Sequence, residues 1–497
     1  MCVFKGICKA TRCYFEHKNM RKRGVFGVAI QFGRKKITAK YESIDATNVV
    51  DALASALSPH SINKSAIEFL YGYYRGDTPI LGKTKAYRQE VNNRVGVATA
   101  IEIVSFYVGY IMSDAISYIR HDAANGSAEI TNRIVELNDW CRMAGKKRTD
   151  DSLLEWALIC GTSYRACAPE LDRADETPFE TYVLDPRYTF VAYSRRNSER
   201  AVFAVNINNR VGGGNEYTVY TRERVYTVVS NRVVADEPNA IGIIPIVEYP
   251  ANPMRMGIFE PVVPLLNALE TIQSSRVDAV VQDVDNVLAI IGCDPGDPKK
   301  AGTVANMLRE LRMLILPNKD CDAKYITAPL KQADIQTVCS SIYSSILTIT
   351  GVPNRNGGSS TSDTGAAVQL RDGWESAETR ARRLVDMFKP AEVEFIRIAN
   401  AIATLQGFAP PAVKDVKVEF PRRYSENVLT NVQALQGLIA TGISLEDALP
   451  MVHLVSDPLD VAVRNKERVD KLLFPETTTT EVQDGAETDE NNAADGN

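Results

Sequence analysis

The sequence has no apolar run near the roughly 20 residues that a membrane-spanning helix requires. Its N-terminus, MCVFKGICKATRCYF, is interrupted by Lys5, Lys9 and Arg12, and so lacks the continuous apolar segment of a signal peptide. We therefore expect no signal peptide and no membrane partner. A chain of 497 residues is long enough for about two to four domains with sizeable cores.

Motifs typical of metal binding and catalysis are also missing. The nine cysteines include no C-x-x-C pair, and the four histidines form neither H-x-H nor H-E-x-x-H. We interpret the cysteines as reduced thiols in a cytosolic compartment. Asp278, Asp283 and Asp285 could serve as metal ligands, but no second acidic motif matches them, so we expect a solvated or interhelical face. The sequence predicts no metal, no cofactor, no catalytic residue and no enzyme.

One segment, Gly76–Thr84 (GDTPILGKT), superficially resembles a phosphate-binding loop. Five residues separate Gly76 from Gly82, where the motif has four, and Pro79 removes an amide that could bind phosphate. The segment also follows a helical pattern instead of a strand. Nucleotide hydrolysis here is the enzyme alternative, and an ATP-binding assay would test it.

Each end of the chain lacks charge of one sign. Residues 1–40 carry many lysines and arginines and only Glu16 as an acid, whereas Glu476–Asn497 carry acids and no base. The acidic tail has almost no large apolar residue, so we expect it to be disordered. The basic start could contact nucleic acid or an acidic neighbour, and a solvated surface explains it equally well.

The most informative stretch is a helix, a polar break and a longer helix. Apolar residues at helical spacing predict a helix over Ala333–Thr350, and Pro353–Gly365 (PNRNGGSSTSDTG) has no large apolar side chain to bury. From Asp363 a heptad pattern continues to Gln406, which requires another helix against it. We expect Pro390 to kink this helix without ending it.

The rest of the chain alternates between helical and strand patterns. We expect helices over Ser43–Pro59, Ser61–Tyr74, Asn92–Ile119, Asp139–Gly145, Asp151–Cys160, Gly257–Asp285, Ser425–Ala440, Ser444–Met451 and Leu459–Leu473. Short alternating strands follow Ser163, with a hairpin turn at Gly212–Gly214, and further strands are VLAIIG, AKYITAP and Lys417–Pro421. This order predicts an α+β fold.

Four stretches share their order and spacing with phage portal proteins of the SPP1-like family. They are YGYYRGDTPI with NNRVGVATAIEIVSFYVGYIMSDAISY, the long stretch from IGIIPIVEYP to DNVLAIIG, SSIYSSILTITGVPNRNGGSSTSDTGAAVQLR, and TGISLEDALPMVHLVSDPLDVAVRNKERVDKL. Together they cover most of residues 65–473, and the chain resembles this family strongly. The basic first forty residues and the acidic tail fall outside the resemblance.

The resemblance implies a division of the chain into named parts. These are a wing (1–255), stem helix 1 (256–285), a clip (286–329), stem helix 2 (330–351), a tunnel loop (352–362), a long kinked helix returning through the wing (363–420), a helical crown (421–473) and the acidic tail (474–497). It also implies a ring of twelve subunits at one capsid vertex of the virion, assembled in the host cytoplasm, through which double-stranded DNA passes.

Site residues and partners follow from the same resemblance. The tunnel loop would face DNA through Asn354, Arg355, Asn356, Gly357, Gly358, Ser359 and Ser360. The clip would bind the terminase large subunit and later a head–tail adaptor, using Lys299, Lys300, Arg309 and Arg312. Major capsid or scaffolding protein is a further expected partner. The alternative is another phage structural adaptor or minor capsid protein that has no DNA channel.

Overall fold

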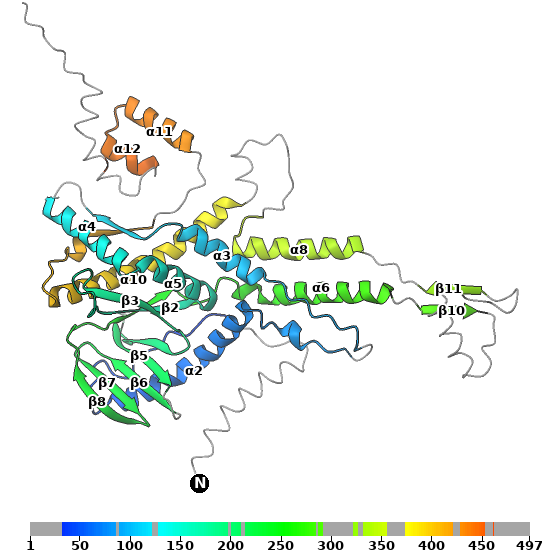
Figure 1. Ribbon diagram of the computed structural model, residues 1–497, viewed down its shortest axis with the longest axis horizontal. Coiled ribbons are helices and arrows are strands. Elements are labelled where there is room, and N and C mark those ends of the chain that lie inside the picture. Colours follow the sequence, from blue (N-terminus) through cyan, green and yellow to red (C-terminus); the bar gives the residue numbers. More distant parts are fainter. Residues whose placement is uncertain are drawn as a thin grey trace, which may run out of the picture. The chain divides into compact units, whose positions relative to one another are not determined.

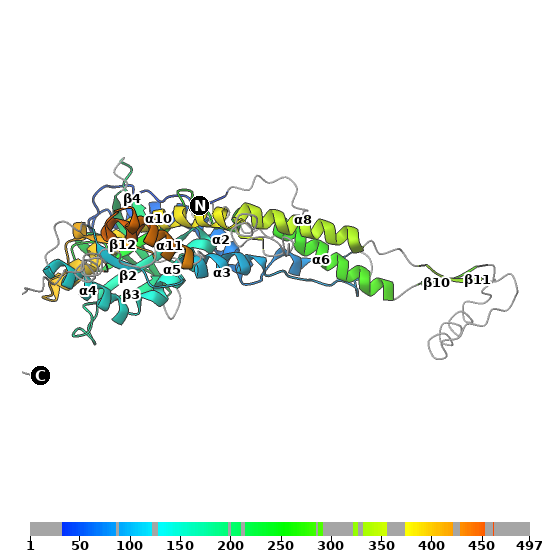
Figure 2. The ribbon, with the colours of Figure 1, turned by 90° about the horizontal axis from the view of Figure 1, so that it is seen from above.

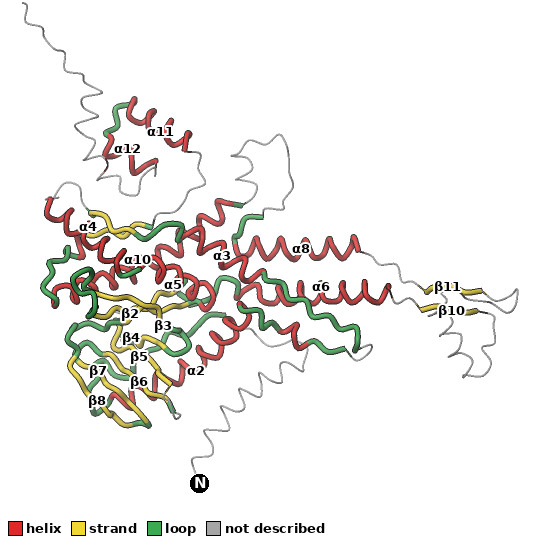
Figure 3. Tube along the Cα trace, in the orientation of Figure 1, coloured by secondary structure: helices red, strands yellow, loops and turns green. Residues whose placement is uncertain are grey.

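The computed structural model describes residues 32–85, 89–121, 128–196, 200–209, 214–284, 287–291, 322–326, 332–354, 373–420, 428–452 and 461. The chain divides into two compact units, the first made of Met1–Tyr118 with Ser127–Arg423 and the second of Ile119–Gly126 with Tyr424–Asn497. The first unit mixes helices with antiparallel sheets (Figure 3). The fold is therefore α+β, as the sequence predicts.

The helical base of the first unit differs from the sequence prediction at two places. A single helix, α2 (Val49–Tyr74), replaces the two predicted helices and contains Pro59. Its buried residues lie on both sides of the proline, so tertiary packing outweighs the one lost backbone hydrogen bond. The predicted helix over Asn92–Ile119 is wrong at both ends, because α3 covers only Thr99–Ile111 and strand β1 follows at Ser117–Arg120.

Two further helices and a short turn complete this base. The helix predicted over Asp139–Gly145 is wrong at both ends, because α4 covers Ala128–Met143. The helix predicted over Asp151–Cys160 is confirmed in longer form as α5 (Lys146–Cys160). A 3-10 turn, η1 (Pro79–Gly82), lies between α2 and α3. None of the helices that the structure describes is both long and apolar enough to cross a bilayer.

Two antiparallel sheets account for the predicted alternating strands. One has the order β3-β2-β9, with β2 (Thr162–Pro169), β3 (Phe179–Leu184) and β9 (Ile246–Pro250). The other has the order β4-β5-β6-β7-β8, with β4 (Thr189–Tyr193), β5 (Ala201–Asn209), β6 (Asn215–Tyr220), β7 (Arg224–Val229) and β8 (Arg232–Pro238). The pairing of Asn209 with Asn215 confirms the predicted hairpin.

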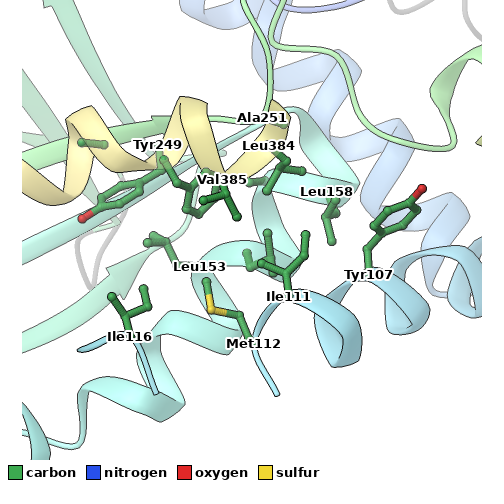
Figure 4. Packing of buried hydrophobic residues seen from close by; sticks show 14 of the residues in the cluster. Tyr107, Ile111, Met112, Ile116, Leu153, Leu158, Tyr249, Ala251, Leu384 and Val385 are labelled. Carbon is green, nitrogen blue, oxygen red and sulfur yellow. The ribbon is translucent and has the colours of Figure 1, made fainter. Parts of the chain in front are cut away.

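Buried apolar residues form two clusters in this unit. The larger cluster joins α3, α5, β9 and α10 (Trp374–Leu405), and Figure 4 shows Ile111, Leu153, Tyr249 and Leu384 meeting there. The smaller cluster fills the space between α2 and the five-stranded sheet. The larger cluster also includes buried residues of the two stem helices, so one part of each helix is packed into this core. We call the helices and sheets around this core the base.

The stem helices lie side by side in Figure 1 and again in the turned view of Figure 2. The first, α6 (Val263–Val284), follows a 3-10 turn, η2 (Glu260–Val262), so the prediction of a helix from Gly257 begins too early. The second, α8 (Gln332–Thr350), confirms the predicted helix. Between them in sequence, β10 (Val287–Ile291) pairs antiparallel with β11 (Asp322–Ile326).

Helix α10 continues through Pro390 without stopping, as predicted, and its predicted start at Asp363 lies outside the described residues. After it come η3 (Val413–Asp415) and the predicted strand β12 (Val416–Glu419). The second unit contains α11 (Val428–Ala440) and α12 (Leu445–Val452), which confirm two predicted helices. Of the helix predicted over Leu459–Leu473, only residue 461 is described.

A buried charge network fixes α10 to the base. The Glu392 carboxylate lies 2.5 Å from Lys146 Nζ and 3.2 Å from Arg165 Nη1, while Lys146 and Arg165 also pair with Asp150. Tyr249 and a second tyrosine, Tyr118, donate hydrogen bonds to Glu392 at 2.6 and 2.9 Å. Helix α10 is therefore held to α5 and to strands β2 and β9 by charge as well as by apolar packing.

The charged state of Glu392 depends on these neighbours. Burial alone would raise its pKa, but the nearby Lys146 and Arg165 cations outweigh burial and lower the pKa to about 2. The carboxylate thus remains ionised over the physiological pH range. The buried charges of the network compensate one another only while every member is present, because an uncompensated buried charge destabilises the folded state.

Replacing Glu392 tests this balance. We expect Glu392→Ala to lower the free energy of unfolding by about 3–5 kcal/mol, because it leaves two buried cations short of a counter-charge. The control is Glu394→Ala on the exposed side of α10, which removes an exposed pair with Arg397 and should cost no more than about 1 kcal/mol. Urea unfolding measures both, and equal effects would contradict the role of the network.

Candidate functional site

The candidate site is the end of α8, where the expected tunnel loop begins. The amide of Val352 donates to Leu347 O at 3.0 Å, and the amide of Gly351 donates to Thr348 O at 3.3 Å. These two bonds, with Gly351 at φ +73°, form a Schellman motif that ends the helix. The apolar contact typical of this motif is available because Val352 and Leu347 are both buried. We call residues 350–354 the loop root.

Two neighbouring helices fix the loop root. Tyr107 of α3 donates its hydroxyl hydrogen bond to Thr350 O at 2.8 Å, so one of the orphan carbonyls of the helix end is satisfied by a buried side chain. Arg380 of α10 lies against the position that a side chain at Gly351 would occupy. The chain therefore leaves α8 from a fixed point and not from a fraying helix end.

The two stem helices are held together by polar bonds as well as by buried residues. Arg276 of α6 donates to Gln332 Oε1 at 2.7 Å and to Gln336 Oε1 at 2.6 Å on α8. Farther along α8, Tyr343 donates to the carboxylate of Glu102 on α3 at 2.8 Å. Polar bonds therefore hold α8 to α6 near its start and to α3 farther along.

The exposed side of α8 is almost uncharged. Its one charged residue is Asp334, and it contains neither lysine nor arginine. Hydroxyls on this side donate to the helix's own carbonyls, as Thr337 does to Ala333 O at 2.9 Å and Thr348 to Ser344 O at 2.8 Å. The side chains of α8 itself therefore offer no cation to a phosphate group.

Most of the predicted site residues lie outside the described part of the chain. Asn354 is described, and its Nδ2 lies 3.4 Å from Ser344 Oγ. The other predicted tunnel-loop residues, Arg355, Asn356, Gly357, Gly358, Ser359 and Ser360, and the clip residues Lys299, Lys300, Arg309 and Arg312 are not described. Their roles remain predictions.

The sequence predicted that Asp278 lies on a solvated or interhelical face, and this prediction is wrong. Asp278 is only 2% exposed and pairs with Lys83 at 3.0 Å and Lys85 at 2.6 Å. Burial opposes its charged form, but hydrogen bonds from Lys85, Asn93 and Lys83 hold its pKa well below the usual range. Lys83 belongs to the segment that resembled a phosphate-binding loop, and here it binds a carboxylate of its own chain.

The described histidines and cysteines give no metal site. No group of three potential ligands comes together among the residues that the structure describes. Buried His60 has its pKa lowered to about 4 by burial, and Cys141 has its pKa raised to about 12 for the same reason. Cys141, Cys160, Cys167 and Cys339 are buried free thiols.

Sequence reasoning missed Tyr107, Arg276 and Glu392 as structural anchors. Tyr107 lies within an apolar helical pattern, where a tyrosine is not distinguished from an ordinary core residue. Glu392 had a usable signal, since it lies among the apolar positions of α10, next to buried Ala391 and Phe395. A charge on an apolar face requires a buried partner.

This geometry is that of a scaffold, in which long helices are fixed to a rigid base. A family model described as "Phage portal protein, SPP1 Gp6-like" matches residues 57–473. The chain therefore belongs to this family of phage portal proteins, and the resemblance inferred from sequence is confirmed. Membership makes it a bacteriophage structural protein. No curated protein matches the sequence.

Comparison with solved structures matches two chains from gene transfer agent particles. One is titled "Neck of empty GTA particle computed with C6 symmetry"; it is 16% identical, covers 72% of this chain and 90% of that chain, and has a TM-score of 0.41. The other is titled "Virion of native gene transfer agent (GTA) particle"; it is 13% identical, covers 73% of this chain and 92% of that chain, and also has a TM-score of 0.41.

Alanine at Gly351 tests the cap of α8. We expect Gly351→Ala to destabilise the protein by at least about 1–2 kcal/mol, because a left-handed backbone is strained for alanine and Arg380 must move aside. Gly109→Ala is the matched control, since Gly109 lies inside α3 with open space around it and should gain about 0.5–1 kcal/mol. Urea unfolding distinguishes them, and changes of the same sign would refute the cap.

Proposed function

We propose that this portal-family chain assembles as a homododecameric ring at one vertex of the capsid. Family membership over residues 57–473 carries the proposal. The stem supports it independently, because its helices expose Val277, Val280 and Val281 on α6 and Val338 on α8. An apolar surface on a rod of two helices favours coverage by neighbouring copies.

The centre of the ring is the channel through which double-stranded DNA is packaged and later ejected. A channel that moves DNA must not hold it, since each neutralised phosphate tightens binding with a salt slope of about −0.9. The base-free surface of α8 is suited to such a channel. A basic lining repeated around a ring would instead slow DNA movement.

The tunnel loop projects from its fixed root towards the DNA. Asn354, Arg355, Asn356, Gly357, Gly358, Ser359 and Ser360 form this DNA-facing segment. Arg355 is its only base, so the loop guides DNA by steric contact and contributes little electrostatic attraction.

The clip is the binding site for two partner proteins in succession. Strands β10 and β11 form an antiparallel pair whose edges could pair with another chain. Lys299, Lys300, Arg309 and Arg312 add positive charge to the same part of the sequence. The partners are the terminase large subunit during packaging and a head–tail adaptor afterwards. Residues 421–473 form the crown on the capsid-interior side, where major capsid or scaffolding protein is the neighbour, after assembly in the host cytoplasm.

Particle shape and mass test the ring. Negative-stain microscopy of the purified full-length protein should give rings with a central hole, and native mass spectrometry should give a multiple of the 54.8 kDa chain near twelve. A protein that stays a single copy under all assembly conditions would contradict the proposal. It would instead favour an adaptor or minor capsid protein without a channel.

Loss of the tunnel loop tests its role in packaging. Deleting Asn354–Ser360 should leave ring assembly intact and reduce the DNA packaged per particle, because the steric guide is gone. A same-length glycine–serine replacement restores the bulk of the loop without Arg355 and should restore most packaging. Normal packaging by the deletion variant would refute the guiding role.

A further inference from the structure

Residues 93–97 form an extended segment that runs along stem helix α6 before α3 begins. Their burial alternates: Asn93, Val95 and Val97 are half-buried, while Arg94 and Gly96 are exposed. This period of two is typical of a strand. No neighbouring strand is paired with it in the described sheets, so its backbone amides must find other acceptors. We call residues 93–97 the strap.

Side chains of α6 supply those acceptors at regular intervals. The amide of Val97 donates to Glu270 Oε1 at 3.1 Å, and the amide of Val95 donates to Ser274 Oγ at 2.9 Å. The amide of Asn93 donates to Asp278 Oδ1 at 2.7 Å. Glu270, Ser274 and Asp278 are all buried. We call these three residues the ladder.

The spacing of the ladder matches the spacing of the strap. Four residues of α-helix rise about 6 Å, and two residues of extended chain rise about 6.6 Å. Every second amide of the strap therefore meets every fourth side chain of α6, with the two segments running in opposite directions. Three consecutive bonds in this register favour a specific attachment of the strap to α6.

The three residues of the ladder differ in chemistry along α6. Asp278 also holds Lys83 and Lys85, which precede the strap, so this end is fastened by charge. Burial raises the pKa of Glu270, against the opposing hydrogen bond from the Val97 amide. Ser274 holds the middle with a neutral hydroxyl, whose loss leaves the two ends in place.

The strap leads directly into α3, and α3 reaches the loop root. Thr99 begins α3 two residues after Val97. Two turns later, Tyr107 donates to Thr350 O at 2.8 Å, and Glu102 of the same helix accepts from Tyr343 on α8. Hydrogen bonds and the continuous backbone thus connect α6 through the strap and α3 to Thr350, the residue before Gly351.

We propose that the strap couples the position of stem helix α6 to the position of the loop root, by a route through α3 and Tyr107 that reaches the last residue of α8, Thr350. Movement of α6 along its axis shifts the ladder, and the strap transmits that shift to α3 and Tyr107. The coupling is a property of the folded chain and stands whether or not the protein forms a DNA channel. Within the proposed function, it would carry a displacement of the stem to the tunnel loop.

Removing the middle of the ladder tests the coupling. In Ser274→Ala the Val95 amide loses its acceptor, and hydrogen exchange in peptides covering 93–97 should accelerate about two- to tenfold. Exchange in peptides covering 350–354 should accelerate as well, although no residue there has been changed. Ser275→Ala, its exposed neighbour on α6, is the control and should alter neither region. The measurement uses the full-length protein without DNA or other partners.

A second variant locates the route. Tyr107→Phe removes the bond to Thr350 O, so exchange should accelerate at the loop root and remain unchanged in the strap. Asp278→Asn provides another weakening of the ladder if Ser274→Ala does not fold. Faster strap exchange with an unchanged root would overturn the coupling, and unchanged strap exchange would overturn the ladder itself. A failure to form rings would contradict the proposed function and leave these exchange results interpretable.

Discussion

A helix that packs against one partner helix buries only one stripe of its own surface, and this limit applies to the outer part of the stem. Helices α6 and α8 bury Leu266, Leu269, Ile346 and Leu347 near the base, where the rest of the chain surrounds them. Farther out, α6 exposes three valines, and Val280 is 45% accessible. A single chain cannot cover that surface without adding another layer. In the proposed ring, neighbouring copies of the same rod would cover this surface.

In the base, buried ion pairs and hydrogen bonds join the segments that hold the stem helices. The Arg34–Glu260 pair fastens the N-terminal described segment to the turn before α6, and Glu392 fastens α10 to α5 and the three-stranded sheet. Tyr107 fastens α3 to the end of α8, and the strap that leads into α3 is fastened to α6. Each attachment joins residues far apart in sequence. The base can therefore act as one body from which the stem, and the loop root after it, are positioned.

The sequence predicted the elements whose signal is local. Alternation predicted the run of short strands after Ser163, and apolar spacing located α8 almost to the residue. Strand β8 was missed because its exposed pattern, with Asp236 and Glu237, is that of a sheet edge. The strap was predicted as helix because Val97 continues the apolar spacing of α3. Its extended form depends on acceptors from α6, about 180 residues away in sequence, which no local pattern records. The candidate site could be located from its polar composition, but its root could not, because Tyr107 resembles any core tyrosine.

A reconstruction of the assembled protein by electron cryomicroscopy, without imposed symmetry, tests the central claim most directly. The account predicts copies arranged around an open channel, with the α6–α8 pairs covering one another's exposed valines and Asn354 at the channel wall. It would be contradicted by particles in which the valines of α6 remain in solvent, or in which Asn354 lies on the outer surface.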